Sequence, residues 1–106
     1  MGGAAELSVM VLYYVRKGDA WMSAESDYRT QRQRIEKSVS EMEPGAKCMW
    51  DETHAPRYLR FAVKHESTGA LLIESSGDWT PAEVGNKSDR ELKDFIAILS
   101  GSRLRT

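Results

Sequence analysis

The sequence predicts an α+β fold with the element order β-β-α-β-β-β-α, a mainly antiparallel sheet and two helices packed on one face of it. Two observations support this prediction: three consecutive strand patterns between residues 46 and 75, and a helical pattern on either side of them. At 106 residues the chain is long enough for one modest hydrophobic core. We therefore expect a single domain over residues 1–106, with loose ends at 1–7 and 102–106.

The first part of the chain predicts a β-hairpin. Residues 8–16 are β-branched and aromatic without helical spacing, which is typical of a strand buried on both faces. A turn over residues 17–19 leads into a second strand over 20–25, with Trp21 and Met22 on opposite faces. If this hairpin lies at the edge of the sheet, the 8–16 strand can pair with a second copy, so we expect a homodimer through it.

A helix is predicted over residues 27–43. Ser26 or Asp27 can cap its start, and Pro44 ends it because proline disfavours helical geometry in the residue before it. Its apolar face consists of four residues at helical spacing: Tyr28, Ile35, Val39 and Met42.

Three strands follow, over residues 47–50, 58–63 and 70–73. The second shows the alternation of apolar and polar residues that is typical of a half-buried strand. Residues 66–69 form the loop to the third strand, with Gly69 where a positive φ is needed.

The C-terminal part predicts two capped helices. Thr80 begins a short turn that ends at Gly85, and Ser88 begins a helix over residues 88–99 that ends before Gly101. Ile98 widens the apolar face of this helix. The main core is expected between the helix and the second hairpin, and its members are Leu59, Phe61, Val63, Leu92, Phe95, Ile96 and Leu99.

Composition argues against several classes of function. The net charge of −1 provides no field to attract nucleic acid or an anionic membrane, and the longest apolar run, Val9–Val15, is too short to cross a bilayer. The single cysteine, Cys48, excludes an internal disulfide and favours a cytoplasmic protein.

The residues that could carry chemistry form no catalytic or metal-binding pattern. Cys48 and His54 lie six residues apart, but Cys48 shares a strand face with Trp50, which indicates packing. His54 and His65 lack metal-ligand spacing, and residues 85–88 fail as a phosphate-binding loop because Asn86 separates the glycine from the lysine. We therefore predict no catalytic residue, no metal and no cofactor.

Basic and aromatic residues are the candidates for binding. The helix over 27–43 is locally basic, and three tryptophans are many for this length, although each is more often a core residue than a stacking platform. Our candidate binding residues are Arg29, Arg32, His54, Arg57, Trp21 and Trp79.

Two short strings lie at corresponding places in a known family. Residues 54–58, His-Ala-Pro-Arg-Tyr, fall between the first two strands after the helix, and residues 88–93, Ser-Asp-Arg-Glu-Leu-Lys, open the last helix. With the helix–strand–strand–strand–helix order, these strings resemble the double-stranded-RNA-binding domain, which has a histidine-containing loop and a Ser-Lys-Lys-x-Ala-Lys segment there. The resemblance implies minor-groove contacts from the first helix and the loop, and phosphate contacts from the basic segment. Asp89 and Glu91 depart from that pattern, because acids repel phosphate.

The sequence thus favours a non-catalytic binding or interaction domain with a protein or small-ligand partner. The alternative is a nucleic-acid-binding domain that uses Arg29, Arg32, Arg34, Arg57 and Arg90. A small enzyme built around Cys48 and His54 is the third possibility.

Overall fold

A computed structural model describes residues 24–101 and 103–104 of the chain, and within them the fold is of the α+β class. A long helix over residues 24–42 comes first, and it is called the long helix below. The strands β1 (Ala46–Trp50), β2 (Phe61–His65) and β3 (Leu71–Ile73) follow, and then the helices α2 (Pro81–Gly85) and α3 (Asp89–Leu99). The hairpin predicted over residues 8–25 lies outside the described residues up to residue 23.

The long helix begins earlier than the sequence pattern indicated. Ala24 and Glu25 are helical, so the predicted strand over residues 20–25 is wrong at these two positions, and Ser26 and Asp27 lie inside the helix instead of capping it. The physical reason is local, because Glu25 forms an ion pair of 3.7 Å with Arg29 four residues later, in the orientation that stabilises helices.

The three strands form one antiparallel sheet in the order β1-β2-β3. Cys48 lies opposite Val63 and Trp50 opposite Phe61, while Val63 lies opposite Ile73. The predicted second strand is shifted: it spans Phe61–His65 instead of residues 58–63. The reason is that Leu59 pairs with Trp79 in an isolated bridge, in which each backbone N–H donates to the other residue's carbonyl.

The turn and cap predictions at residues 66–101 are confirmed. Gly69 has φ +72° at the end of the β2–β3 loop, where a side chain would be strained. Thr80 and Ser88 each form a capping box, with Glu83 and Glu91 respectively. Both helices therefore begin at the residues that the sequence indicated.

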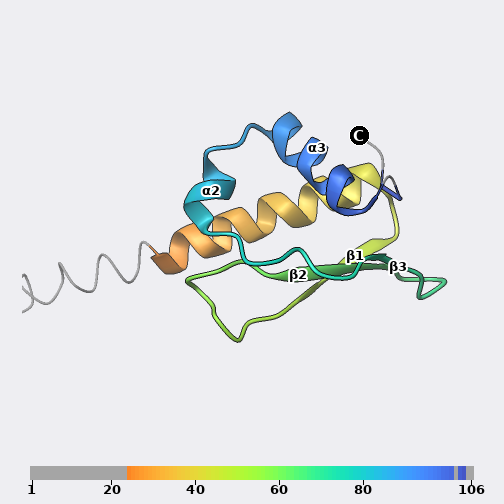
Figure 1. Cartoon of the computed structure of the whole chain (residues 1–106), viewed down its shortest axis with the longest axis horizontal. Helices are drawn as coiled ribbons and strands as arrows, with labels where there is room; N and C mark the ends of the chain where they lie inside the picture. The colour runs from red at the N-terminus through yellow and green to blue at the C-terminus, as the bar shows by residue number, and fades with distance from the viewer. Residues whose placement is uncertain (1–23, 102, 105–106) are drawn as a thin grey trace, which may run out of the picture.

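All three helices lie on one side of the sheet, with the long helix running beside it (Figure 1). The core between them is made of residues from every layer: Tyr28, Ile35, Val39, Leu59, Phe61, Val63, Ile73, Trp79, Val84, Leu92, Ile96 and Leu104. Phe61 is 2% exposed, as the predicted strand register requires.

Two apolar residues of α3 do not enter this core. Phe95 is 36% exposed and Ile98 is 76% exposed, so the predicted core is wrong for Phe95, and Ile98 does not widen the buried face. Leu92 and Ile96 are the residues of α3 that are fully buried in the core. Phe95 lies at the rim of the core instead. Its ring makes an edge-to-face contact with Trp79, with 4.7 Å between the ring centroids. The Lys87 ammonium lies 4.9 Å from the centroid of the Phe95 ring.

The chain after α3 folds back onto the core. Leu104 is 1% exposed, and its backbone N–H donates to the Ser100 hydroxyl at 2.9 Å. The Arg103 guanidinium donates to the Leu71 carbonyl at 3.3 Å, so this segment also touches β3. The predicted loose end over 102–106 is therefore wrong at residues 103 and 104, because Leu104 has an apolar side chain that the core accepts.

Candidate functional site

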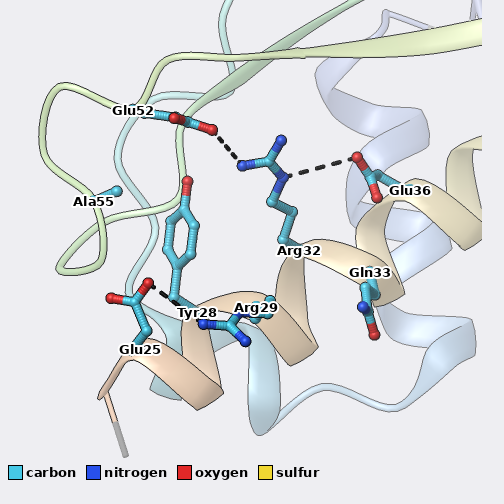
Figure 2. Close-up of a pocket in the computed structure, with 8 residues that line it drawn as sticks. All are labelled: Glu25, Tyr28, Arg29, Arg32, Gln33, Glu36, Glu52 and Ala55. Atoms are coloured by element: carbon cyan, nitrogen blue, oxygen red, sulfur yellow. Dashed lines mark hydrogen bonds and ion pairs between the residues drawn. The ribbon is translucent and has the colours of Figure 1, made fainter. Parts of the chain in front are cut away.

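A hollow of about 320 Å³ lies between the first turns of the long helix and the loop that joins β1 to β2. We call it the Tyr28 hollow. Figure 2 shows the helix side chains on one side and Glu52 and Ala55 of the loop on the other. Eight residues line it: Glu25, Tyr28, Arg29, Arg32, Gln33, Glu36, Glu52 and Ala55.

Tyr28 places an unsatisfied polar group in this wall. Its side chain is 6% exposed, and its buried hydroxyl has no hydrogen-bond partner among the described residues. In Figure 2 the hydroxyl points into the space between Glu52 and Arg32. The guanidinium lies close to it, but no hydrogen bond of acceptable geometry joins the two. A buried hydroxyl without a partner costs free energy, and such atoms are uncommon in folded proteins.

The charge state of Tyr28 follows from its surroundings. Burial raises the pKa of its phenol, and the positive charge of Arg32 opposes this shift without cancelling it. The phenol is therefore neutral at physiological pH, and it offers one O–H donor together with acceptor lone pairs.

Arg32 connects the two walls of the hollow. Its Nη1 donates to Glu52 Oε2 at 2.6 Å, and its Nε lies 3.8 Å from Glu36 Oε2. The guanidinium also lies over the Trp50 ring, 4.8 Å from the centroid, which is a cation–π contact. These contacts hold the β1–β2 loop against the long helix.

Trp50 and Glu36 fix the back of this arrangement. The Trp50 indole N–H donates to Glu36 Oε2 at 2.8 Å, and the ring lies 5.2 Å from that of Phe61. Trp50 is therefore anchored to the core on one side and to Arg32 on the other. Arg32 and Glu36 lie four residues apart on the long helix, which is a spacing at which side chains of opposite charge meet.

The predicted binding residues fall in different places. Arg29 and Arg32 line the hollow, and Arg29 is the more exposed, with 68% of its side chain accessible. His54 and Arg57 are exposed in the β1–β2 loop outside the lining, where the ring edge of His54 faces Tyr58 at 6.5 Å. Trp79 is buried, with its indole N–H donating to the Ser76 carbonyl. Trp21 lies outside the described residues.

The Arg34 side chain forms hydrogen bonds to distant parts of the chain. Its guanidinium donates to the carbonyls of Val84 and Lys87 at 3.1 and 2.8 Å, and to Asp89 Oδ1 at 2.9 Å. The positive charge of Arg34 lowers the pKa of Asp89, with a direct hydrogen bond as the main cause. Arg34 therefore joins the long helix to the segment between α2 and α3, and Asp89 provides its counter-charge.

Six lining residues were not among the predicted binding residues: Glu25, Tyr28, Gln33, Glu36, Glu52 and Ala55. Tyr28 was assigned to the apolar face of the helix, which is correct for its ring, but the sequence gives no sign that its hydroxyl lacks a partner. Glu52 lies 20 residues from Arg32 in the chain, and no local pattern links the two.

Cys48 and His54 do not form an activated pair. Burial raises the pKa of the Cys48 thiol to about 12, and the negative charge of Glu36 adds to the shift. Cys48 is half-buried on the core side of β1, whereas His54 is exposed in the loop. The other histidine, His65, contacts the Ser67 hydroxyl through Nδ1 at 3.0 Å and lies 3.7 Å from Glu43 through Nε2.

Two further findings concern the described residues. None of their helices is long and apolar enough to cross a membrane. Their histidine, cysteine, aspartate and glutamate side chains form no group of three or more that could hold a metal ion.

Comparison with family models, curated proteins and solved structures finds no significant match to this chain.

Proposed function

We propose that this protein is a non-catalytic binding domain and that the Tyr28 hollow is its binding site. The observation that carries the proposal is Tyr28, a lining residue of the hollow whose buried hydroxyl lacks a hydrogen-bond partner within the described part of the chain. A bound molecule that reached this hydroxyl would satisfy it, which no other described residue does. The mixed charges around it would orient such a molecule.

The chemistry of the site supports binding without catalysis. With a pKa of about 12, the Cys48 thiol is protonated at neutral pH and is a poor nucleophile. The carboxylates of the hollow pair with arginines: Glu25 with Arg29, and Glu36 and Glu52 with Arg32. A carboxylate that is already paired with a guanidinium is less available to take a proton from a substrate, so it is a weak general base.

Nuclear magnetic resonance on the ¹⁵N-labelled full chain tests the proposal. A library of small polar fragments should shift the backbone amide signals of the first turns of the long helix and of the β1–β2 loop. Tyr28→Phe should remove these shifts, whereas Tyr58→Phe, the same change outside the hollow, should leave them. Shifts that cluster on the exposed Phe95 and Ile98 of α3 instead would place binding elsewhere and contradict the proposal.

A double-stranded-RNA-binding function is the second candidate, and the element order favours it. Over the described residues the long helix precedes three antiparallel strands and α3 follows them, with α2 inserted between. The long helix and the β1–β2 loop meet at one surface, as that family requires (Figure 2). The engagement of Arg32 and Arg34 within the fold reduces the positive charge available to phosphates.

The partner, location and assembly are also parts of this proposal. We propose a small-ligand or protein partner, on the grounds of the hollow, and a cytoplasmic location, on the grounds of the single cysteine. The homodimer through residues 8–16 stays a prediction from the sequence, because these residues lie outside the described part of the chain.

A further inference from the structure

We propose that the Tyr28 hollow binds a compact amino acid of net positive charge, whose carboxylate takes the place of Glu52 at Arg32. This inference rests on the proposed function and specifies its ligand. Three features carry it: the hydroxyl of Tyr28, the ion pair that closes over it, and the charge balance of the lining.

The Tyr28 hydroxyl sets the first requirement. Its oxygen is closed off from solvent, and Figure 2 shows it below the ion pair between Arg32 and Glu52. A ligand therefore reaches it only when that ion pair separates. Because the phenol is neutral and carries a donor, the matching ligand group is an acceptor such as a carboxylate.

The ion pair sets the second requirement. Separating Arg32 from Glu52 leaves the carboxylate without its partner and the guanidinium with only the longer ion pair to Glu36, at 3.8 Å. A ligand carboxylate can accept from both Arg32 and Tyr28, while a ligand ammonium can pair with the released Glu52. A zwitterion therefore exchanges one ion pair for two. A simple anion leaves Glu52 uncompensated, and a simple amine leaves Arg32 without a close carboxylate.

The charge balance of the lining sets the third requirement. Three carboxylates and two guanidiniums face the hollow, which gives it a net charge of −1 (3 negative, 2 positive). The ion pairs of Glu25 with Arg29, at 3.7 Å, and of Glu36 with Arg32, at 3.8 Å, are both longer than that of Glu52 with Arg32, at 2.6 Å. Because Glu36 also accepts from the Trp50 indole at 2.8 Å, Glu25 is the carboxylate most easily shared with a ligand. A second ammonium on the ligand neutralises the site.

Size is consistent with this class of ligand. A hollow of about 320 Å³ is at the small end of ligand sites and has room for a single amino acid. Gln33 adds an amide at the rim that can donate or accept.

Titration calorimetry of the full-length chain with four related probes tests the inference. L-lysine carries all the required groups, norleucine lacks the side-chain ammonium, cadaverine lacks the carboxylate and L-glutamate inverts the net charge. L-lysine should bind about tenfold more tightly than each of the others, because each one lacks a charge-assisted contact.

Variants with matched controls locate the site. Tyr28→Phe should weaken L-lysine binding about fivefold, as expected for loss of one hydrogen bond, and its thermal midpoint should equal or exceed that of the wild type, since an unsatisfied buried hydroxyl is removed. Tyr58→Phe should change neither. Glu52→Gln brings the net charge of the lining to zero and should reduce the preference for L-lysine over norleucine, whereas Glu66→Gln, equally exposed and also ion-paired, should not.

The outcomes separate the ligand from the site. If another probe binds as tightly as L-lysine and Tyr28→Phe weakens that binding, the ligand class is wrong and the Tyr28 hollow remains the binding site. If Tyr28→Phe and Tyr58→Phe bind L-lysine equally well, the hollow is not the site and the inference fails together with the proposed function. Failure of all four probes to bind overturns the inference alone, because the fragment experiment still tests the hollow.

Discussion

At the scale of single residues, the core of this protein is centred on Phe61. Its ring lies 5.2 Å from that of Trp50 and 5.7 Å from that of Trp79, and it is 2% exposed. Its backbone N–H donates to the Ser76 hydroxyl at 2.8 Å. One side chain therefore connects β1, β2 and the segment before α2.

Phe61→Ala should lower the free energy of unfolding by about 3–5 kcal/mol, because it removes a fully buried ring and leaves a cavity. Urea denaturation followed by tryptophan fluorescence measures this. Phe95→Ala is the control: its ring is 36% exposed and touches Trp79 at its edge, so the loss should be about 1–2 kcal/mol. Equal losses for the two variants would contradict this assignment of the core.

The Cys48 thiol links stability to alkaline pH. Its pKa is raised from 9.0 to about 12 on folding, so the folded protein keeps this proton where the unfolded chain releases it. Stability from this group is complete below the unfolded pKa and is lost as pH rises toward the folded value.

Between pH 8 and pH 10 the wild type should lose about 1.4 kcal/mol more unfolding free energy than Cys48→Ala does, the effect of one pKa unit. Urea denaturation at the two pH values measures the difference, and the contributions of the other titrating groups cancel because both proteins contain them.

Iodoacetamide at neutral pH should label Cys48 only after unfolding. Rapid labelling of the native protein would show that the thiolate is accessible.

At the scale of helices and strands, Arg34 holds the long helix to the segment that joins α2 and α3. Residues 50 to 55 positions apart in the chain meet through this one guanidinium. Gln31 supports it, since its side-chain oxygen accepts from Arg34 Nη1 at 2.8 Å. The fork geometry of arginine allows several carbonyls to be reached at once.

Arg34→Lys should therefore cost about 1.5–3 kcal/mol of unfolding free energy, although the charge is kept, because an ammonium cannot satisfy two carbonyls and a carboxylate in these directions. Arg29→Lys on the same helix is the control, and it should change stability by about 0.5 kcal/mol or less, since Arg29 is exposed and weakly paired. Thermal denaturation of both variants measures these two losses of stability. A loss as small in Arg34→Lys as in Arg29→Lys would mean that only the charge matters there.

Much of the described fold could be predicted because its determinants are local. The capping boxes at Thr80 and Ser88 and the turn at Gly69 depend on residues within four positions of one another. The strand start was misplaced because Leu59 pairs with Trp79, 20 residues away. Only two of the eight residues of the candidate site, Arg29 and Arg32, were predicted, for the same reason. The Arg32–Glu52 contact and the unsatisfied Tyr28 hydroxyl depend on tertiary structure.

At the scale of the whole molecule, charge distribution bears on nucleic-acid binding. Arg32 and Arg34 have carboxylate partners in the fold, and Asp89 stands at the start of α3, where the RNA-binding family has a lysine. With a net charge of −1, the protein as a whole provides no positive field to attract a polyanionic duplex.

Binding to duplex RNA should accordingly be weak, with a Kd of about 10 μM or higher at physiological salt. Fluorescence anisotropy with a labelled duplex of about 20 base pairs, which covers the span that such a domain contacts, measures it at several salt concentrations. A sub-micromolar Kd that weakens steeply with salt would contradict the preferred function and make the RNA-binding alternative the leading one.

The predicted self-association is a second property of the whole molecule. If residues 8–16 pair with a second copy, light scattering at micromolar concentration should give about twice the chain mass of 12.0 kDa. Val11→Lys should then return the protein to a monomer and leave most of its helical signal, because a charge on an edge strand opposes strand pairing. A wild-type mass near that of one chain would exclude this dimer.

The return of the chain after α3 has a practical consequence for protein engineering. Leu104 is held in the core and Arg103 touches β3, so a purification tag or a fluorescent fusion joined directly at this point would begin against packed side chains. A spacer rich in glycine and serine after Leu104 would let the added domain clear this surface. Variants truncated after the last turn of α3 would keep every helix and strand described above. They would nevertheless lose a fully buried leucine and should be poor starting material for crystallisation or directed evolution.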